Sequence, residues 1–89
     1  MLVTTKNILG KAQKGNYAVG AFNTNNMEMT QAIIEAAVES KSPVIIATSE
    51  GAIEYAGFGY LYAILSIAAK APVPVAIHLD HGKDLDIIK

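Results

Sequence analysis

The chain has 89 residues and a formal net charge of −1, from 7 basic and 8 acidic side chains. This balance excludes the basic excess that usually marks a nucleic-acid-binding protein. The absence of cysteine excludes a disulfide scaffold, a thiolate metal site and a cysteine nucleophile. Charged residues make up only 17% of the chain, against about 25% in ordinary soluble domains. Because a short chain has a large surface relative to its volume, we expect further protein to cover part of this one.

The sequence shows no membrane or targeting signal. No apolar stretch reaches the roughly 18 residues that a transmembrane helix needs. The first residues lack the basic region and apolar core of a secretory signal. We therefore expect a cytoplasmic protein without a membrane partner.

The first half of the chain predicts a helix, a strand and a second helix. Thr4 or Thr5 is a candidate N-cap for the first helix, which is expected to end at Gly15. The apolar run at 17–22 predicts a strand, and the loop after it ends in another candidate N-cap. The apolar positions of the second helix, from residue 27 to about 40, have the spacing of one amphipathic face; they are Met29, Ala32, Ile33, Ala36 and Ala37.

The same pattern then repeats along the second half. Pro43 follows the second helix, and residues 44–48 form a second apolar run. A helix is expected at 60–70 and a third strand at 73–79. The last residues, 84–89, are typical of the beginning of another helix.

Alternation of strands and helices predicts an α/β fold with a parallel sheet. The strands are almost continuously apolar, as expected for parallel strands that are covered on both faces. An open doubly wound sheet and a (β/α)8 barrel both fit this pattern. The loops carry neither a G-x-G-x-x-G motif nor a P-loop, which favours the barrel. A barrel takes about 250 residues, so residues 1–89 are expected to form its N-terminal part, with about three βα units of one incomplete domain.

In such folds the functional groups collect at the carboxyl ends of the strands. Asn23 follows the first predicted strand, Ser49 and Glu50 follow the second, and the third ends in His78-Leu-Asp-His81. Alternation along the third strand puts His78 and Asp80 on one face together with Ala76, and Val75 and Ile77 on the other. Glu50, after the second strand, is interpreted as a charge behind the site or on the surface.

Two interpretations of the His-rich tetrapeptide compete. Neutral imidazole is the commonest metal ligand, and a nearby carboxylate can be a ligand or an acid/base group. Alternatively, His78 is a hydrogen-bonded core residue and Asp80 is a helix N-cap. The H-x-H-x-D-H signature of metallo-β-lactamase-like hydrolases is incomplete here, because its first histidine falls on Ala76.

A wider resemblance covers the whole chain. The opening helix and three later segments resemble the beginning of the class II, metal-dependent fructose-bisphosphate aldolases, in that family's order and spacing. These segments are YAVGAFNTNN (17–26), SPVIIATSEG (42–51) and PVAIHLDHG (74–82). The resemblance implies a (β/α)8 TIM barrel and reversible, zinc-dependent cleavage of fructose 1,6-bisphosphate to dihydroxyacetone phosphate and glyceraldehyde 3-phosphate, a step of glycolysis and gluconeogenesis.

The resemblance also implies roles for individual residues. His81 matches a ligand of zinc or another divalent metal, and Asp80 matches the general acid/base that takes the proton from the C4 hydroxyl. Ser49 and Asn23 match substrate-binding residues; their alternative roles are a turn or cap and an Asx-turn. His78 is either a contact of the substrate or of a metal ligand, or a buried structural histidine. No lysine lies inside a predicted strand, which argues against a Schiff-base mechanism. The tyrosines and the Met27–Met29 pair are assigned to packing.

A catalytic zinc needs about three protein ligands, so the remaining ligands, the phosphate-binding loops and a monovalent-cation site are expected in the remainder of the barrel. The resemblance further implies a phosphorylated ketose substrate and a homodimer or homotetramer. A tagatose-bisphosphate aldolase of the same family and a non-catalytic barrel fragment remain alternatives, with a metallo-β-lactamase-like hydrolase as a remote one.

Overall fold

The computed structural model describes residues 1–49, 51, 52, 54 and 57–80. The predicted alternation of helices and strands is confirmed over these residues. In chain order the elements are α1 (Thr5–Gly15), β1 (Ala21–Asn23), α2 (Met27–Glu39), β2 (Val44–Ser49), α4 (Phe58–Lys70) and β3 (Val75–Asp80).

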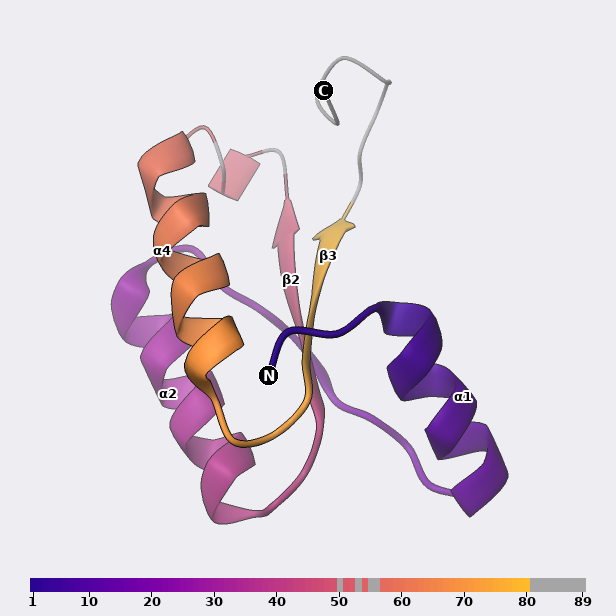
Figure 1. Cartoon of the computed structure of the whole chain (residues 1–89). Helices are drawn as coiled ribbons and strands as arrows, with labels where there is room; N and C mark the ends of the chain where they lie inside the picture. The colour runs from indigo at the N-terminus through magenta and orange to yellow at the C-terminus, as the bar shows by residue number, and fades with distance from the viewer. Residues whose placement is uncertain (50, 53, 55–56, 81–89) are drawn as a thin grey trace.

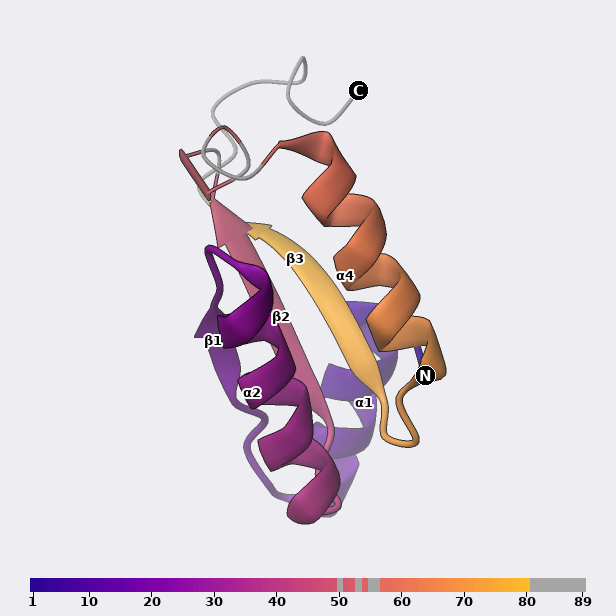
Figure 2. The same ribbon diagram turned by 90° about the vertical axis from the view of Figure 1, so that its left-hand side faces the viewer.

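The three strands form one parallel sheet in the order β1-β2-β3. Helices α2 and α4 both lie on one face of this sheet, and α1 lies on the other (Figures 1 and 2). A doubly wound sheet reverses its strand order and places connecting helices on both faces. Sequential order with both connecting helices on one side is instead the arrangement of a barrel wall.

Two apolar clusters hold these layers together. The larger lies between the sheet and the two connecting helices, and it includes Ile46 and Val75, both 0% exposed, with Ile34 and Ala68. The smaller lies on the opposite face, where Ile8 of α1 packs against Ile45 and Ala76. Val75 and Ala76 therefore face opposite sides of the sheet, as their alternation along the strand predicts.

Local sequence signals explain where the helices begin. The Thr4 side chain accepts a hydrogen bond from the Asn7 amide at 3.1 Å, and the Asn26 Oδ1 accepts one from the Met29 amide at 2.8 Å. Both are N-caps. Helix α1 ends at Gly15, as predicted, and the next residue, Asn16, takes the left-handed conformation with φ 57°. Asparagine tolerates this conformation better than most residues.

The strand boundaries also differ from the predicted ones. The first strand is β1, residues 21–23, rather than 17–22, and its three residues are exposed. Among the described residues its only strand neighbour is β2, so little holds the preceding residues in the sheet. The third strand begins at Val75 and continues through Asp80. Asp80 is therefore the last residue of this strand, and the helix predicted at 84–89 lies outside the described residues.

The predicted apolar face of α2 is rotated from the observed one. The residues buried against the sheet are Thr30, Ile34 and Ala37. Of the predicted positions Ala37 is buried and Ile33 is half-buried, whereas Met29, Ala32 and Ala36 are exposed. The helix is apolar over a wide arc, so its sequence alone permitted either rotation.

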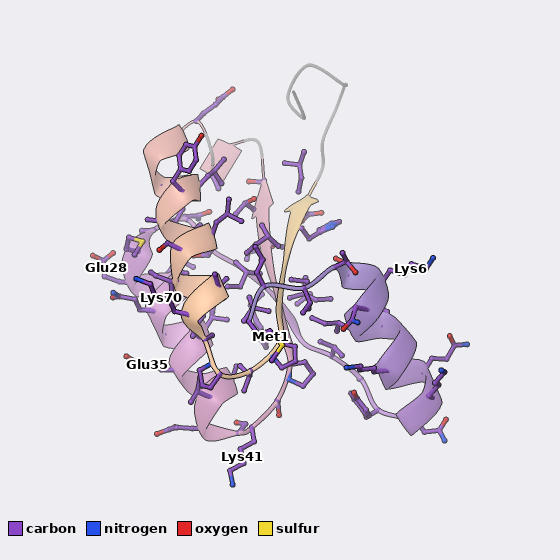
Figure 3. The ribbon with its side chains drawn as sticks, viewed as in Figure 1. Met1, Lys6, Glu28, Glu35, Lys41 and Lys70 are labelled. Atoms are coloured by element: carbon purple, nitrogen blue, oxygen red, sulfur yellow. The ribbon has the colours of Figure 1, made fainter. Side chains whose placement is uncertain are left out.

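Charged side chains lie on the outer surface. Glu28, Glu35 and Lys41 point away from the sheet, and Lys6 projects from the far side of α1 (Figure 3). Within the described parts of the chain, no helix is long and apolar enough to span a membrane.

Candidate functional site

The sheet register brings the predicted site residues onto one face. Asn23 of β1 pairs with Ala47 of β2, and Ala47 pairs with His78 of β3. In the same ladder Ser49 pairs with Asp80. Paired residues of neighbouring strands point to the same face, and residues two apart along a strand share a face. Asn23, His78, Ser49 and Asp80 therefore share the face that carries Ile45 and Ala76.

Helix α1 covers this face only in the part that lies away from the carboxyl ends of the strands. Ile8 of α1 packs on Ala76, whereas the helix lies away from the strand ends (Figure 1). The side chains of His78 and Asp80 are accordingly 52% and 34% exposed, with 3.9 Å between His78 Nε2 and Asp80 Oδ1. The described residues by themselves therefore leave His78 exposed, and its role stays a prediction.

Ser49 lies beside a hollow at the carboxyl edge of the sheet. Its Oγ accepts a hydrogen bond from the Ala52 amide at 3.1 Å, so it caps the turn that follows β2. The hollow has a volume of about 490 Å³ and lies between the loops that follow β1 and β2; its lining residues are Asn25, Asn26, Met29, Ser49, Gly51 and Ala52. Because a hydroxyl that accepts one bond still has its own proton to donate, Ser49 remains able to bind a ligand oxygen.

Sequence analysis missed a buried group of hydroxyls at the same edge. Thr24 and Thr30 are 0% exposed and Tyr60 is 9% exposed. The Tyr60 hydroxyl lies 2.9 Å from Thr24 Oγ1, 2.7 Å from Thr30 Oγ1 and 2.6 Å from the Asn26 carbonyl oxygen. Tyr60 thus does more than pack, contrary to the expectation for the tyrosines.

One sequence signal could have revealed this group. Thr30 has the same helical phase as Ile34 and Ala37, which are buried. A hydroxyl on a buried helix face needs a hydrogen-bond partner. The partners Thr24 and Tyr60 are 6 and 30 residues away, so no local pattern identifies them.

The predicted metal site cannot be assembled from the described residues alone. His81, the predicted ligand, lies outside the described residues, as does Glu50. Among the residues described, no group of three or more His, Cys, Asp or Glu side chains could hold a metal ion. His78 and Asp80 nevertheless place an imidazole and a carboxylate at the strand end next to position 81, and these are donor types that zinc accepts. The three strands contain no lysine.

A second, larger hollow of about 840 Å³ runs between the edge strand and α2. Its lining includes Tyr17 and Phe22, which are 47% and 52% exposed, with Ile33 and Val44. Exposed aromatic side chains beside an edge strand are typical of a surface that further protein covers.

Comparison with known proteins agrees with this geometry. The family model described as "Fructose-bisphosphate aldolase class-II" matches residues 3–89. A fructose-bisphosphate aldolase of Thermus caldophilus is 57% identical over 99% of this chain, and the match takes up 29% of that relative. A 6-phospho-5-dehydro-2-deoxy-D-gluconate aldolase of Halalkalibacterium halodurans is 45% identical over 99% of this chain and 32% of its own length.

The crystal structure of the YdjI aldolase from Escherichia coli K12 superposes with a TM-score of 0.92 at 39% identity, over 99% of this chain and 35% of that one. This chain therefore spans about a third of the length of its relatives, and it has the architecture of about three βα units of their TIM barrel. The matched family model, the relatives and the shared fold show that the chain belongs to the class II fructose-bisphosphate aldolase family.

Proposed function

We propose that the complete barrel containing these residues cleaves fructose 1,6-bisphosphate reversibly to dihydroxyacetone phosphate and glyceraldehyde 3-phosphate. One observation carries the proposal: in a chain of this family, the register aligns Asn23 and His78 in one row and Ser49 and Asp80 in the next, at the carboxyl end of the sheet. This is the edge where TIM-barrel enzymes hold their substrates.

Asp80 is proposed as the general acid/base. In cleavage its carboxylate takes the proton from the C4 hydroxyl, and in condensation it returns that proton to the aldehyde oxygen. Two features support this role: its side chain is 34% exposed, so substrate can reach it, and it is a strand residue whose backbone is held by pairing with Ser49. The His78 imidazole, 3.9 Å away, is close enough to hold the carboxylate or the substrate through a small movement.

His81 is proposed as a zinc ligand, with the other ligands supplied by the remainder of the barrel. The imidazole and carboxylate donors at the end of β3 fit zinc in chemical type. When bound, zinc supplies a Lewis acid that stabilises the negative charge left on the dihydroxyacetone phosphate oxygens when the carbon–carbon bond breaks. No lysine in the three described strands competes with this mechanism by offering a Schiff base.

Ser49 and Asn23 are proposed to bind the substrate. The Ser49 hydroxyl borders the 490 Å³ hollow and is oriented by its bond to the Ala52 amide. The Asn23 amide is exposed and has both donor and acceptor atoms for sugar hydroxyls.

The remainder of the barrel is the proposed occupant of the apolar hollow beside β1, where Tyr17 and Phe22 are exposed. We further propose that the complete protein is a homodimer or homotetramer in the cytoplasm. Its membership of this aldolase family supports the oligomeric state and the compartment.

The test is a coupled cleavage assay with the complete enzyme. Asp80→Asn is expected to lower kcat by about 10²–10⁴-fold while the zinc content stays at the wild-type level. His81→Ala is expected to lose zinc first. Full activity of Asp80→Asn would contradict the acid/base role of Asp80. Full zinc occupancy in His81→Ala would contradict the ligand role of His81. Removal of metal with a chelator is expected to abolish cleavage, and added zinc to restore it.

The sugar is tested in the same assay. Fructose 1,6-bisphosphate, tagatose 1,6-bisphosphate and 6-phospho-5-dehydro-2-deoxy-D-gluconate are compared by kcat/KM, because a relative named for the last substrate is 45% identical to this chain. The proposal expects the highest value for the fructose sugar. A higher value for either competitor would reassign the substrate within the family, and no cleavage of any would contradict an aldolase.

A further inference from the structure

Four oxygen atoms lie in mutual contact beside the 490 Å³ hollow, whose lining includes Asn26. They are the hydroxyl oxygens of Thr24, Thr30 and Tyr60 and the carbonyl oxygen of Asn26. All six distances between them are from 2.6 to 3.1 Å. The centre of such a tetrahedron is about 1.8 Å from each oxygen, which is shorter than the 2.0–2.1 Å of a magnesium–oxygen bond. The group is therefore too tight for a metal ion and must be held by hydrogen bonds.

The three hydroxyls have only three protons for these six contacts, so at most three can be hydrogen bonds at one time. The three shortest contacts form one continuous chain. Thr24 is 2.8 Å from Thr30, Thr30 is 2.7 Å from Tyr60, and Tyr60 is 2.6 Å from the Asn26 carbonyl. If each hydroxyl donates once along this chain, every proton is used and the bonds strengthen one another. The chain ends on Asn26.

Asn26 is thereby held at both ends. Its side chain caps α2 through the Met29 amide, and its carbonyl accepts from the Thr30 amide at 3.1 Å as well as from Tyr60. Tyr60 belongs to the first turn of α4, which follows the segment after Ser49. The hydroxyl chain thus ties the beginnings of α2 and α4, the two helices that follow neighbouring strands (Figure 2).

We propose that Tyr60 is a positioning residue for substrate binding, which acts through Asn26. Asn25 and Asn26, in the loop after β1, line the 490 Å³ hollow together with Ser49 at the end of β2. By fixing the Asn26 carbonyl, Tyr60 sets the position of the loop that joins β1 to α2 and with it the distance across the hollow. The proton-transferring Asp80 lies on β3, outside this linkage. This inference rests on the proposed aldolase function.

The first test compares Tyr60→Phe with Tyr62→Phe in the complete enzyme. Tyr62 is on the same helix but is 77% exposed, so its hydroxyl is the matched control. Tyr60→Phe is expected to raise KM for fructose 1,6-bisphosphate about fivefold, the effect of one lost hydrogen bond, and to leave kcat near the wild-type value. An unchanged KM in Tyr60→Phe would overturn the inference, as would an equal rise in Tyr62→Phe.

A second variant separates positioning from stability. Tyr60→Phe leaves the Thr24 and Thr30 hydroxyls and the Asn26 carbonyl with one hydrogen-bond partner fewer, beside an apolar ring, and this lowers the stability of the fold. The triple variant Thr24→Val, Thr30→Val, Tyr60→Phe removes all three hydroxyls, so most of that penalty disappears. We expect the melting temperature of the triple variant to rise above that of Tyr60→Phe while its KM stays raised. A KM that recovers together with the melting temperature would show a purely structural role and overturn the inference.

Amide hydrogen exchange gives a readout that is independent of catalysis. In the peptide 23–30, exchange is expected to be faster in Tyr60→Phe than in the wild type and unchanged in Tyr62→Phe. If the wild-type enzyme cleaves none of the three sugars, the proposed aldolase function fails, and exchange alone decides the positioning role. Faster exchange in Tyr60→Phe alone supports it, and equal exchange in both variants refutes it.

Discussion

Ile46 provides the sharpest test of the packing that supports the site. It lies in the middle of β2, the strand that ends at Ser49, and its side chain is 0% exposed between the sheet and the helices α2 and α4. Since the described residues already bury it completely, no further part of a barrel can change its exposure. The predicted cost of shortening this side chain therefore depends only on contacts that the structure describes.

Ile46→Ala removes three carbon groups. At about 0.8 kcal/mol for each buried group, the transfer of this surface accounts for about 2.4 kcal/mol. Incomplete collapse of the remaining space adds to this value, so we expect a total loss of about 3–4 kcal/mol, within the range measured for large-to-small core changes. Ile46→Val removes one group at the same position and is expected to cost about 1 kcal/mol.

The assay is urea denaturation of the complete enzyme, followed by circular dichroism, with wild type, Ile46→Val and Ile46→Ala measured together. In a protein of barrel size the larger change corresponds to a fall in melting temperature of about 8 °C. A loss below about 1 kcal/mol for Ile46→Ala, or a loss no greater than that of Ile46→Val, would refute the conclusion that β2 is packed between these helices.

Three further predictions follow from local geometry. Gly57→Ala is expected to lower the stability by about 1–3 kcal/mol, because φ is 84° and ψ is 166° there. Gly59→Ala lies inside α4 with no atom within 4 Å of the added carbon, so it should be neutral or stabilise by up to about 1 kcal/mol. Thermal denaturation of both variants measures the difference, and equal effects would contradict the assigned backbone conformation. Asn26→Ala removes the cap of α2 and should lower the stability by about 1 kcal/mol. Asn25→Ala, at the exposed neighbouring residue, should change the stability by less than about 0.5 kcal/mol. A larger loss for Asn25→Ala than for Asn26→Ala would show that the cap is misassigned. Ser49→Ala should cost about 1 kcal/mol through the lost bond to Ala52 and should also raise KM, which steady-state kinetics measures; an unchanged KM would confine Ser49 to its capping role.

Much of the fold could be predicted because its signals are local. Runs of apolar residues, cap residues such as Thr4 and Asn26, and the break at Pro43 depend on neighbours within a few positions. The same signals indicated that functional residues follow the strands. Where the local signal was weak the prediction failed: the short edge strand β1 began later than its apolar run.

The sequence by itself determined the order of the elements, the parallel βα class and the positions of Asn23, Ser49, His78 and Asp80 at strand ends, because periodicity and capping act over a few residues. Only the tertiary structure decided that both connecting helices lie on one face, that pairing aligns Asn23 with His78 across the sheet, and that the Tyr60 hydroxyl meets the Asn26 carbonyl. These features depend on which faces exclude water together and on partners 30 or more residues apart, and no local pattern contains that information.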